Sequence, residues 1–148
     1  MLDLIIKNGS CYIDKDLKDQ DIAIKDGKIV KIGKIEQDAK EIYEAKGLNV
    51  LPGCIDTQTH FREPGSTDTE DLHSGSRAAI AGGITSVFEM PNTNPPTSSK
   101  KEFQRKLDLA KNRMYCNYAF YFGATADNAK ELADLKNLEG CCGIKLFA

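Results

Sequence analysis

The sequence lacks long apolar runs, and its charges are nearly balanced. No stretch approaches the ~20 apolar residues that a membrane-spanning helix requires. The 20 Lys and Arg and 22 Asp and Glu residues give a formal net charge of −2. No basic segment dominates, so neither nucleic acid nor a membrane is an expected partner. The first residues also lack the basic start, apolar core and cleavage site of a signal peptide. These absences predict a globular, cytoplasmic protein.

Cysteine and histidine are both scarce. The five cysteines are an odd number, and without an export signal this predicts reduced thiols. Cys141 and Cys142 are adjacent, which is not the spacing of a zinc knuckle. We expect them to be small buried residues at the start of a strand. His60 and His73 are the only histidines in the sequence.

The first 52 residues contain short alternating segments separated by turn signals. Asn8-Gly9 and Asp26-Gly27 are dipeptides that favour tight hairpin turns. Polar and apolar residues alternate on both sides of Asp26-Gly27, over residues 21–24 and 28–33. We therefore expect a small antiparallel sheet with a turn at each dipeptide.

Residues 53–148 instead alternate between apolar strands and helices. Strands are expected at 54–56, 84–90, 117–122 and 143–147, and helices at 72–81, 100–112 and 126–135. Gly82-Gly83 is expected to end the first helix, and Ser98 or Ser99 to cap the second. This order predicts an α/β fold with a parallel sheet. Eight such units in roughly 250 residues make a β/α barrel, so about half a barrel is expected here.

Polar residues follow two of the expected strands and interrupt a third. The C-terminal ends of barrel strands face one shared cleft. Because side chains two apart on a strand point the same way, Gln58 and His60 are expected to reach one metal ion. Arg62 follows in the loop, where a guanidinium can hold a carboxylate through two hydrogen bonds. Asn92, after the second strand, could donate to a substrate carboxylate or carbonyl.

Lys145 is a charged residue within an apolar strand. Burial there would favour the neutral amine. A neutral amine can react with carbon dioxide, and the resulting carbamate binds a metal ion through oxygen.

Three segments resemble the dihydroorotase family or its relatives. Residues 52–65, Pro-Gly-Cys-Ile-Asp-x-x-x-His-Phe-Arg-Glu-Pro-Gly, resemble its signature. Residues 90–95, Met-Pro-Asn-Thr-Asn-Pro, resemble its second motif. Residues 143–147, Gly-Ile-Lys-Leu-Phe, are similar to the strand that carries the metal-bridging lysine in many cyclic amidohydrolases. The similarity spans essentially the whole chain.

The resemblance implies a fold and a reaction. The family fold is a (β/α)8 TIM barrel beside a small β-sandwich built from both termini. It implies an N-terminal β-sandwich segment at residues 1–52 and the first half of the barrel at residues 53–148. The implied enzyme is a zinc-dependent dihydroorotase of pyrimidine biosynthesis. It interconverts dihydroorotate and N-carbamoyl-L-aspartate, and a metal ion activates the water that attacks the ring amide.

The resemblance also implies roles for individual residues. His60 would be a zinc ligand, and Lys145 a catalytic, carboxylated ligand that bridges metal ions. Arg62 and Asn92 would bind the substrate carboxylate. The family usually has His-x-His, and here Gln58 replaces the first histidine. An amide oxygen is a weaker zinc ligand than imidazole, so one or two zinc ions are expected.

Other functions stay open at this point. The chain ends before the further histidines and the late aspartate that the family supplies, so it is expected to be inactive alone. Allantoinase and dihydropyrimidinase (hydantoinase) are close rivals, although Arg62 favours a substrate with a carboxylate. A homo-oligomer, or a non-catalytic partner of aspartate transcarbamoylase, is a further alternative.

Each candidate residue also has a purely structural explanation. These are a structural hydrogen bond for His60 or Gln58, a surface ion pair of Arg62 with Glu63 or Asp71, a turn cap for Asn92, and a solvent-directed amine for Lys145. Asp56 is expected to support the end of its strand by hydrogen bonding. His73 is expected to have no catalytic role.

Overall fold

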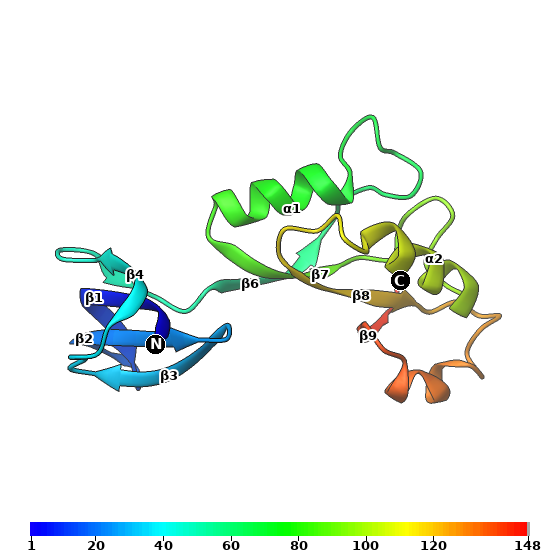
Figure 1. The fold of residues 1–148 in the computed structure, drawn as a ribbon. Coiled ribbons are helices and arrows are strands. Elements are labelled where there is room, and N and C mark those ends of the chain that lie inside the picture. Colours follow the sequence, from blue (N-terminus) through cyan, green and yellow to red (C-terminus); the bar gives the residue numbers. More distant parts are fainter. Residues whose placement is uncertain (148) are drawn as a thin grey trace. The chain divides into compact units, whose positions relative to one another are not determined.

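The computed structural model describes residues 1–147, and the chain divides into two compact units, Met1–Pro52 and Gly53–Ala148. Each unit contains one sheet (Figure 1). Among the described residues, no helix has the length and apolar character needed to cross a membrane.

The first unit is a five-stranded sheet of mixed direction. Its strands are β1 (Leu2–Ile13), β2 (Asp16–Lys25), β3 (Lys28–Gly33), β4 (Ala39–Glu44) and β5 (Asn49–Val50). The order is β3-β2-β1-β4, and β5 also pairs with β1. The first three strands are antiparallel, whereas β4 and β5 lie parallel to β1. The expectation of a purely antiparallel sheet is therefore wrong, because the chain crosses back after β3 and runs along β1 in the same direction.

One of the two predicted turns is confirmed and the other is wrong. Asp26-Gly27 joins β2 to β3, with φ of 50° and 70° at the two residues. Asn8-Gly9 instead lies within β1, where the pairing with β2 shifts register. Asn8 has the positive φ of a turn residue, 59°, but the Asn8 N–H donates to Asp21 Oδ1 (3.0 Å) within the sheet. The hairpin turn falls at residues 14–15, both with positive φ.

The second unit has the predicted alternation of strands and helices. Its elements are β6 (Cys54–Thr59), α1 (Leu72–Ala81), β7 (Ile84–Glu89), α2 (Lys100–Ala110), β8 (Asn117–Gly123), the 3-10 helix η1 (Leu132–Asn137) and β9 (Cys141–Lys145). The four strands are all parallel, in the order β6-β7-β8-β9. The predicted α/β class with a parallel sheet is confirmed for this unit.

The ends of both α-helices follow from their capping residues. Asp71 begins α1 by accepting a hydrogen bond from Ser74 N–H (2.6 Å), and Gly82 ends the helix as predicted. Ser99, one of the two expected caps, accepts from Glu102 N–H (3.2 Å) at the start of α2. The helix expected at 126–135 is only partly formed, since residues 126–131 are a turn and the 3-10 helix η1 follows. Asn128 is buried there, and its amide bonds to the backbone of residues 98, 123 and 125, which holds a turn in place of an α-helix.

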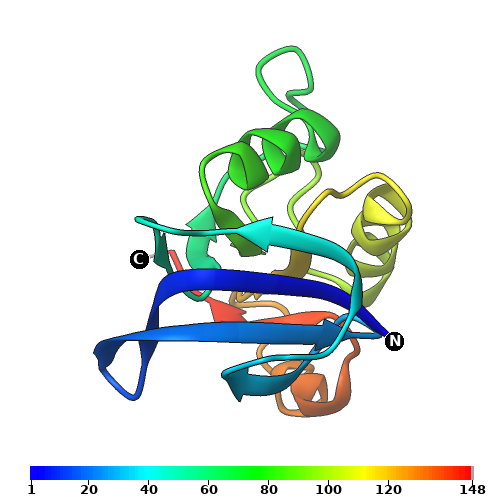
Figure 2. The ribbon, with the colours of Figure 1, turned by 60° about the vertical axis from the view of Figure 1, so that its left-hand side comes forward.

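Helices α1 and α2 lie beside each other and pack on one face of the sheet (Figures 1 and 2). The core between them is centred on Phe103 of α2, whose ring lies near those of Phe120 and Phe122 of β8. Side chains alternate along the strands, so Phe88 and Tyr121 meet edge to face on the opposite side, with ring centroids 6.4 Å apart. The sheet therefore has one face buried by helices and a second face lined by aromatic residues.

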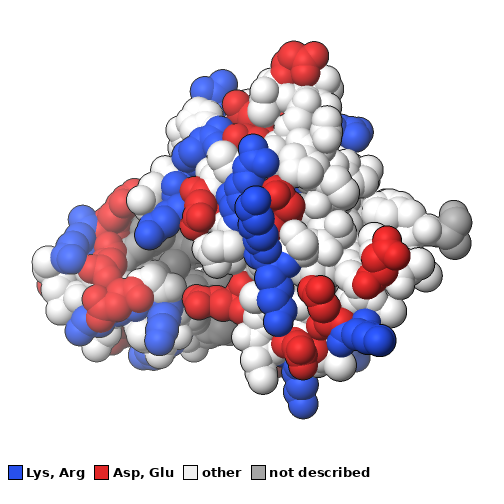
Figure 3. All heavy atoms as spheres, turned by 90° about the vertical axis from the view of Figure 1, so that its right-hand side faces the viewer, with Lys and Arg blue, Asp and Glu red and all other residues white. Residues whose placement is uncertain are grey.

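Basic and acidic side chains lie close together on the surface drawn in Figure 3. This mixture agrees with the nearly balanced composition.

Candidate active site

The predicted site residues lie at or just after the C-terminal ends of parallel strands. His60 follows β6, Asn92 follows β7, and Lys145 is the last residue of β9. Because β6, β7, β8 and β9 are parallel neighbours in that order, these ends lie along one edge of the sheet. Strands β6 and β7 are adjacent, whereas β8 separates β7 from β9.

The structure brings His60 and Asn92 into direct contact. His60 Nδ1 lies 3.0 Å from Asn92 Oδ1. With the amide oxygen as acceptor, Nδ1 carries the proton and Nε2 keeps its lone pair. A histidine oriented through one ring nitrogen in this way can bind a metal ion through the other. Asn92 is therefore placed to orient His60, and the substrate contact expected from its sequence motif stays a prediction.

Arg62 is exposed and has a φ of 63°, in the left-handed region. The two residues that flank it, Phe61 and Glu63, are buried. Within residues 1–147 Arg62 forms no ion pair. The structural explanation that Arg62 pairs with Glu63 or Asp71 is therefore wrong, because Glu63 pairs with Arg113 and Asp71 caps α1.

Gln58 lies in an irregular part of β6. The pairing of β6 with β7 shifts register between Asp56 and Thr59, and the Gln58 N–H donates to Asp56 Oδ1 at 2.9 Å. This bond confirms that Asp56 supports the end of its strand. The Gln58 side chain is exposed, whereas His60 is half-buried beyond the last residue of β6. The pairing is therefore irregular at Gln58, and the expectation that Gln58 and His60 share one face stays a prediction.

Lys145 is half-buried, whereas full burial was expected from its position in an apolar strand. Its carbonyl accepts from Ala124 N–H at 2.8 Å, and its Nζ lies 5.3 Å from the centre of the Phe147 ring. The neighbouring residues Ile144 and Leu146 are exposed. The sequence argument from complete burial of this amine therefore does not apply to residues 1–147.

A buried ion pair that sequence reasoning missed lies behind His60 and Asn92. Glu89, at the end of β7, pairs with Lys106 of α2, and the two side chains are 1% and 0% exposed. Glu89 Oε1 also accepts from Phe61 N–H (3.1 Å), and Lys106 Nζ donates to the Met90 carbonyl (2.9 Å). Burial raises the pKa of Glu89 and lowers the pKa of Lys106, and each partner's charge opposes that shift. The sequence signal was a glutamate at the end of an apolar strand, and a lysine three residues after Phe103 on the buried face of α2.

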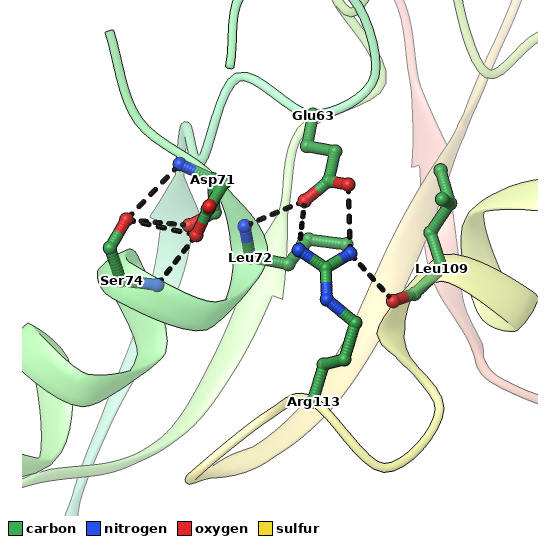
Figure 4. A network of polar contacts seen from close by, with 6 residues as sticks. All are labelled: Glu63, Asp71, Leu72, Ser74, Leu109 and Arg113. Atoms are coloured by element: carbon green, nitrogen blue, oxygen red, sulfur yellow. Dashed lines mark hydrogen bonds and ion pairs between the residues drawn. The ribbon is translucent and has the colours of Figure 1, made fainter. Parts of the chain in front are cut away.

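A second ion pair fixes the loop after Arg62 (Figure 4). The Arg113 guanidinium donates to both Glu63 oxygens, at 2.8 and 3.1 Å, and also to the Leu109 carbonyl at 3.0 Å. Glu63 Oε2 in turn accepts from Leu72 N–H (3.0 Å), at the first turn of α1. The hydrogen bonds to Glu63 raise the pKa of Arg113. Glu63 therefore ties the loop to both helices.

His73 and the adjacent free cysteines Cys141 and Cys142 lie away from these strand ends. His73 is on α1, and its Nε2 lies 3.3 Å from the Tyr115 hydroxyl. Cys141 and Cys142 are half-buried at the start of β9, where full burial was expected. Burial raises the pKa of Cys142 to about 11. Its thiol therefore stays protonated at neutral pH, which disfavours metal binding.

The donor atoms fit a metal centre only in part. The His60 imidazole has the orientation of a zinc ligand, and a lysine can bind metal only as a carbamate. In the part of the chain that the structure describes, no three His, Cys, Asp or Glu side chains gather closely enough to hold a metal ion. Residues 1–147 therefore supply candidate ligands but not a complete ligand set.

Comparisons with known proteins agree with this arrangement of strands and helices. The sequence model of the Amidohydrolase family matches residues 49–140. An allantoinase of Escherichia coli O1:K1 / APEC is 41% identical over 146 residues, which cover 98% of this chain and 32% of that protein. The chain thus spans about a third of the length of the curated relatives it matches.

Solved structures show the same fold. An L-hydantoinase (dihydropyrimidinase) from Arthrobacter aurescens superposes with a TM-score of 0.89 at 30% identity, over 97% of this chain and 32% of that one. A D-hydantoinase superposes with a TM-score of 0.80 at 33% identity, over 95% and 32%. The four-stranded parallel sheet is consistent with part of a β/α barrel. By its sequence match and its fold, the chain belongs to the amidohydrolase family.

Proposed function

We propose that the full-length protein is a metal-dependent cyclic amidohydrolase whose substrate is an allantoin- or hydantoin-type ring. The observation that carries this proposal is the His60–Asn92 contact at the ends of two parallel strands, which leaves one imidazole nitrogen free. Membership of the amidohydrolase family and the similarity to allantoinases and hydantoinases support the choice of ring. These relatives favour that substrate class over dihydroorotate.

In this proposal His60 and a carboxylated Lys145 bind zinc, and Gln58 is at most a weak third ligand. The ion would activate a water molecule for attack on the ring amide carbonyl. Asn92 holds the proton on His60 Nδ1, and Arg62 faces the polar part of the substrate. Further ligands come from residues outside the chain, within a complete eight-unit barrel and a β-sandwich that includes residues 1–52.

Arg62 supports dihydroorotate as a second candidate substrate. It is exposed and has no carboxylate partner within residues 1–147. A guanidinium placed in this way can hold a substrate carboxylate through two hydrogen bonds. A ring without a carboxylate would use Arg62 less.

A substrate panel tests the proposal. Purified full-length protein, loaded with zinc, is assayed with allantoin, hydantoin, dihydrouracil and dihydroorotate, beside a His60→Ala control. We expect the fastest turnover with allantoin or hydantoin, and none with the control. Faster turnover of dihydroorotate, lost in Arg62→Met, would establish the second candidate. No turnover and no bound zinc by elemental analysis would favour a non-catalytic assembly partner.

A further inference from the structure

The two loops that carry His60 and Asn92 are attached to the same buried ion pair. Glu89 accepts the N–H of Phe61, the residue after His60. Lys106 donates to the carbonyl of Met90, two residues before Asn92. Since Glu89 and Lys106 pair with each other, one continuous polar chain runs from the first loop to the second.

Stability alone is a weak explanation for a charged pair in this place. Removing two charges from water is unfavourable, and well-packed apolar residues of similar volume are often equally stable or more so. What an apolar pair could not do is accept the N–H of Phe61 and donate to the carbonyl of Met90. The first group belongs to the residue after His60, and the second belongs to the residue two positions before Asn92; His60 and Asn92 are in contact across the two loops.

The local backbone shows why such a restraint matters. Arg62 has a left-handed φ of 63°, which non-glycine residues adopt rarely. Glu89 holds the residue before it through the Phe61 N–H, and the Glu63–Arg113 pair holds the residue after it. Arg62 therefore lies between two held residues, and His60 directly precedes the first of them.

We propose that Glu89 is a positioning residue of the active site: its bond to the Phe61 N–H, supported by Lys106, sets the His60–Asn92 contact and the direction of Arg62. Glu89 touches neither substrate nor metal in this role. The inference rests on the proposed function only where activity is measured.

Two double variants of the full-length protein separate this role from simple core stability. Both remove the buried charges: E89Q/K106M keeps an amide oxygen that can accept from Phe61, and E89L/K106M does not. We expect kcat of E89Q/K106M to stay within a few-fold of wild type. The kcat of E89L/K106M should fall by up to about a hundredfold with little change in KM, because small misplacements of reacting groups have effects of that size. Arg105→Met, an exposed change on the same helix, is the matched control and should retain activity.

Hydrogen–deuterium exchange, resolved at Phe61, gives a readout that needs no activity. In wild type, this amide should exchange at least about tenfold more slowly than the amide of Gly65, as expected for one buried hydrogen bond. The protection should persist in E89Q/K106M and disappear in E89L/K106M. Equal kcat in the two folded double variants would overturn the proposal.

The exchange measurement also separates this inference from the proposed function. If wild type hydrolyses no cyclic amide, the proposed function fails, and the exchange rates still decide the positioning role. If neither double variant folds, the exchange rate of the Phe61 amide in the wild-type protein is the remaining test. Exchange of Phe61 as fast as Gly65 would then overturn the proposal.

Discussion

Two regions at the C-terminal ends of the parallel strands hold their polar residues in different ways. The ends of β6 and β7 form the first region, the β6–β7 edge, and the end of β9 forms the second, the β9 edge. At the first edge, His60 contacts Asn92, and two ion pairs lie around the loop that carries Arg62. At the second, Lys145 is held through its backbone carbonyl and lies near one aromatic ring. Side-chain contacts thus hold the residues after β6 and β7, whereas a backbone hydrogen bond holds Lys145. Substitutions near β6 and β7 should therefore affect folding, and those at Lys145 should affect chemistry alone.

The largest expected effect comes from breaking the buried pair on one side. Lys106→Met leaves the Glu89 carboxylate enclosed without its cation, so the free energy of unfolding should fall by about 3–5 kcal/mol. Urea denaturation of the full-length protein measures this change. The neighbouring exposed variant Arg105→Met should change it by less than about 0.5 kcal/mol. A loss below about 1 kcal/mol for Lys106→Met would show that the carboxylate finds water or another partner.

The next effect comes from steric contact behind His60. A Cβ on Gly75 of α1 would lie 2.4 Å from Cδ1 of the buried Phe61 ring. Gly75→Ala should therefore displace Phe61 and destabilise the fold by about 1–3 kcal/mol. At Gly82 the nearest atom to an added Cβ is 3.5 Å away, so Gly82→Ala is the matched control. Equal thermal midpoints for the two variants would argue against tight packing of Phe61 on α1.

A smaller loss is expected at the partly exposed pair. Arg113→Met leaves Glu63 with one hydrogen bond, from Leu72 N–H. Because the Arg113 side chain is 37% exposed, water replaces part of the lost interaction. The free energy of unfolding should fall by about 1–2 kcal/mol. Arg77→Met changes an exposed arginine of α1 and serves as the control. If the two variants differ in free energy of unfolding by less than about 0.5 kcal/mol, the Glu63–Arg113 pair does not stabilise the loop.

Much of this fold could be predicted from local signals. Asp71 and Gly82 mark the two ends of α1, and Ser99 marks the start of α2. The signals failed where distant contacts decide. Asn8-Gly9 is a turn dipeptide by sequence, but the bond from Asn8 to Asp21 and the pairing with β4 and β5 keep it inside β1. Likewise, buried hydrogen bonds of Asn128 hold a turn in the first part of the expected helix.

The candidate site could be predicted only in its outline. Position after parallel strands identified His60 and Asn92, since such ends share one edge of the sheet. Their direct contact depends on the conformation of two loops, which no local pattern specifies. Glu89 and Lys106 are separated by a loop and a helical turn, and burying both charges opposes the usual preference for apolar cores. Only the three-dimensional structure shows that they meet.

The smallest effect on folding is expected at the β9 edge. Lys145→Met retains the side-chain length and the backbone bond to Ala124, and removes only a cation near Phe147. The free energy of unfolding should change by less than about 1 kcal/mol. If Lys145 binds the metal as proposed, turnover should nevertheless be lost and zinc content should fall. Lys136→Met, in the adjacent 3-10 helix, should leave both unchanged. A Lys145→Met protein with full zinc and full turnover would remove Lys145 from the site, whereas one that unfolds would show that the β9 edge is held as firmly as the β6–β7 edge.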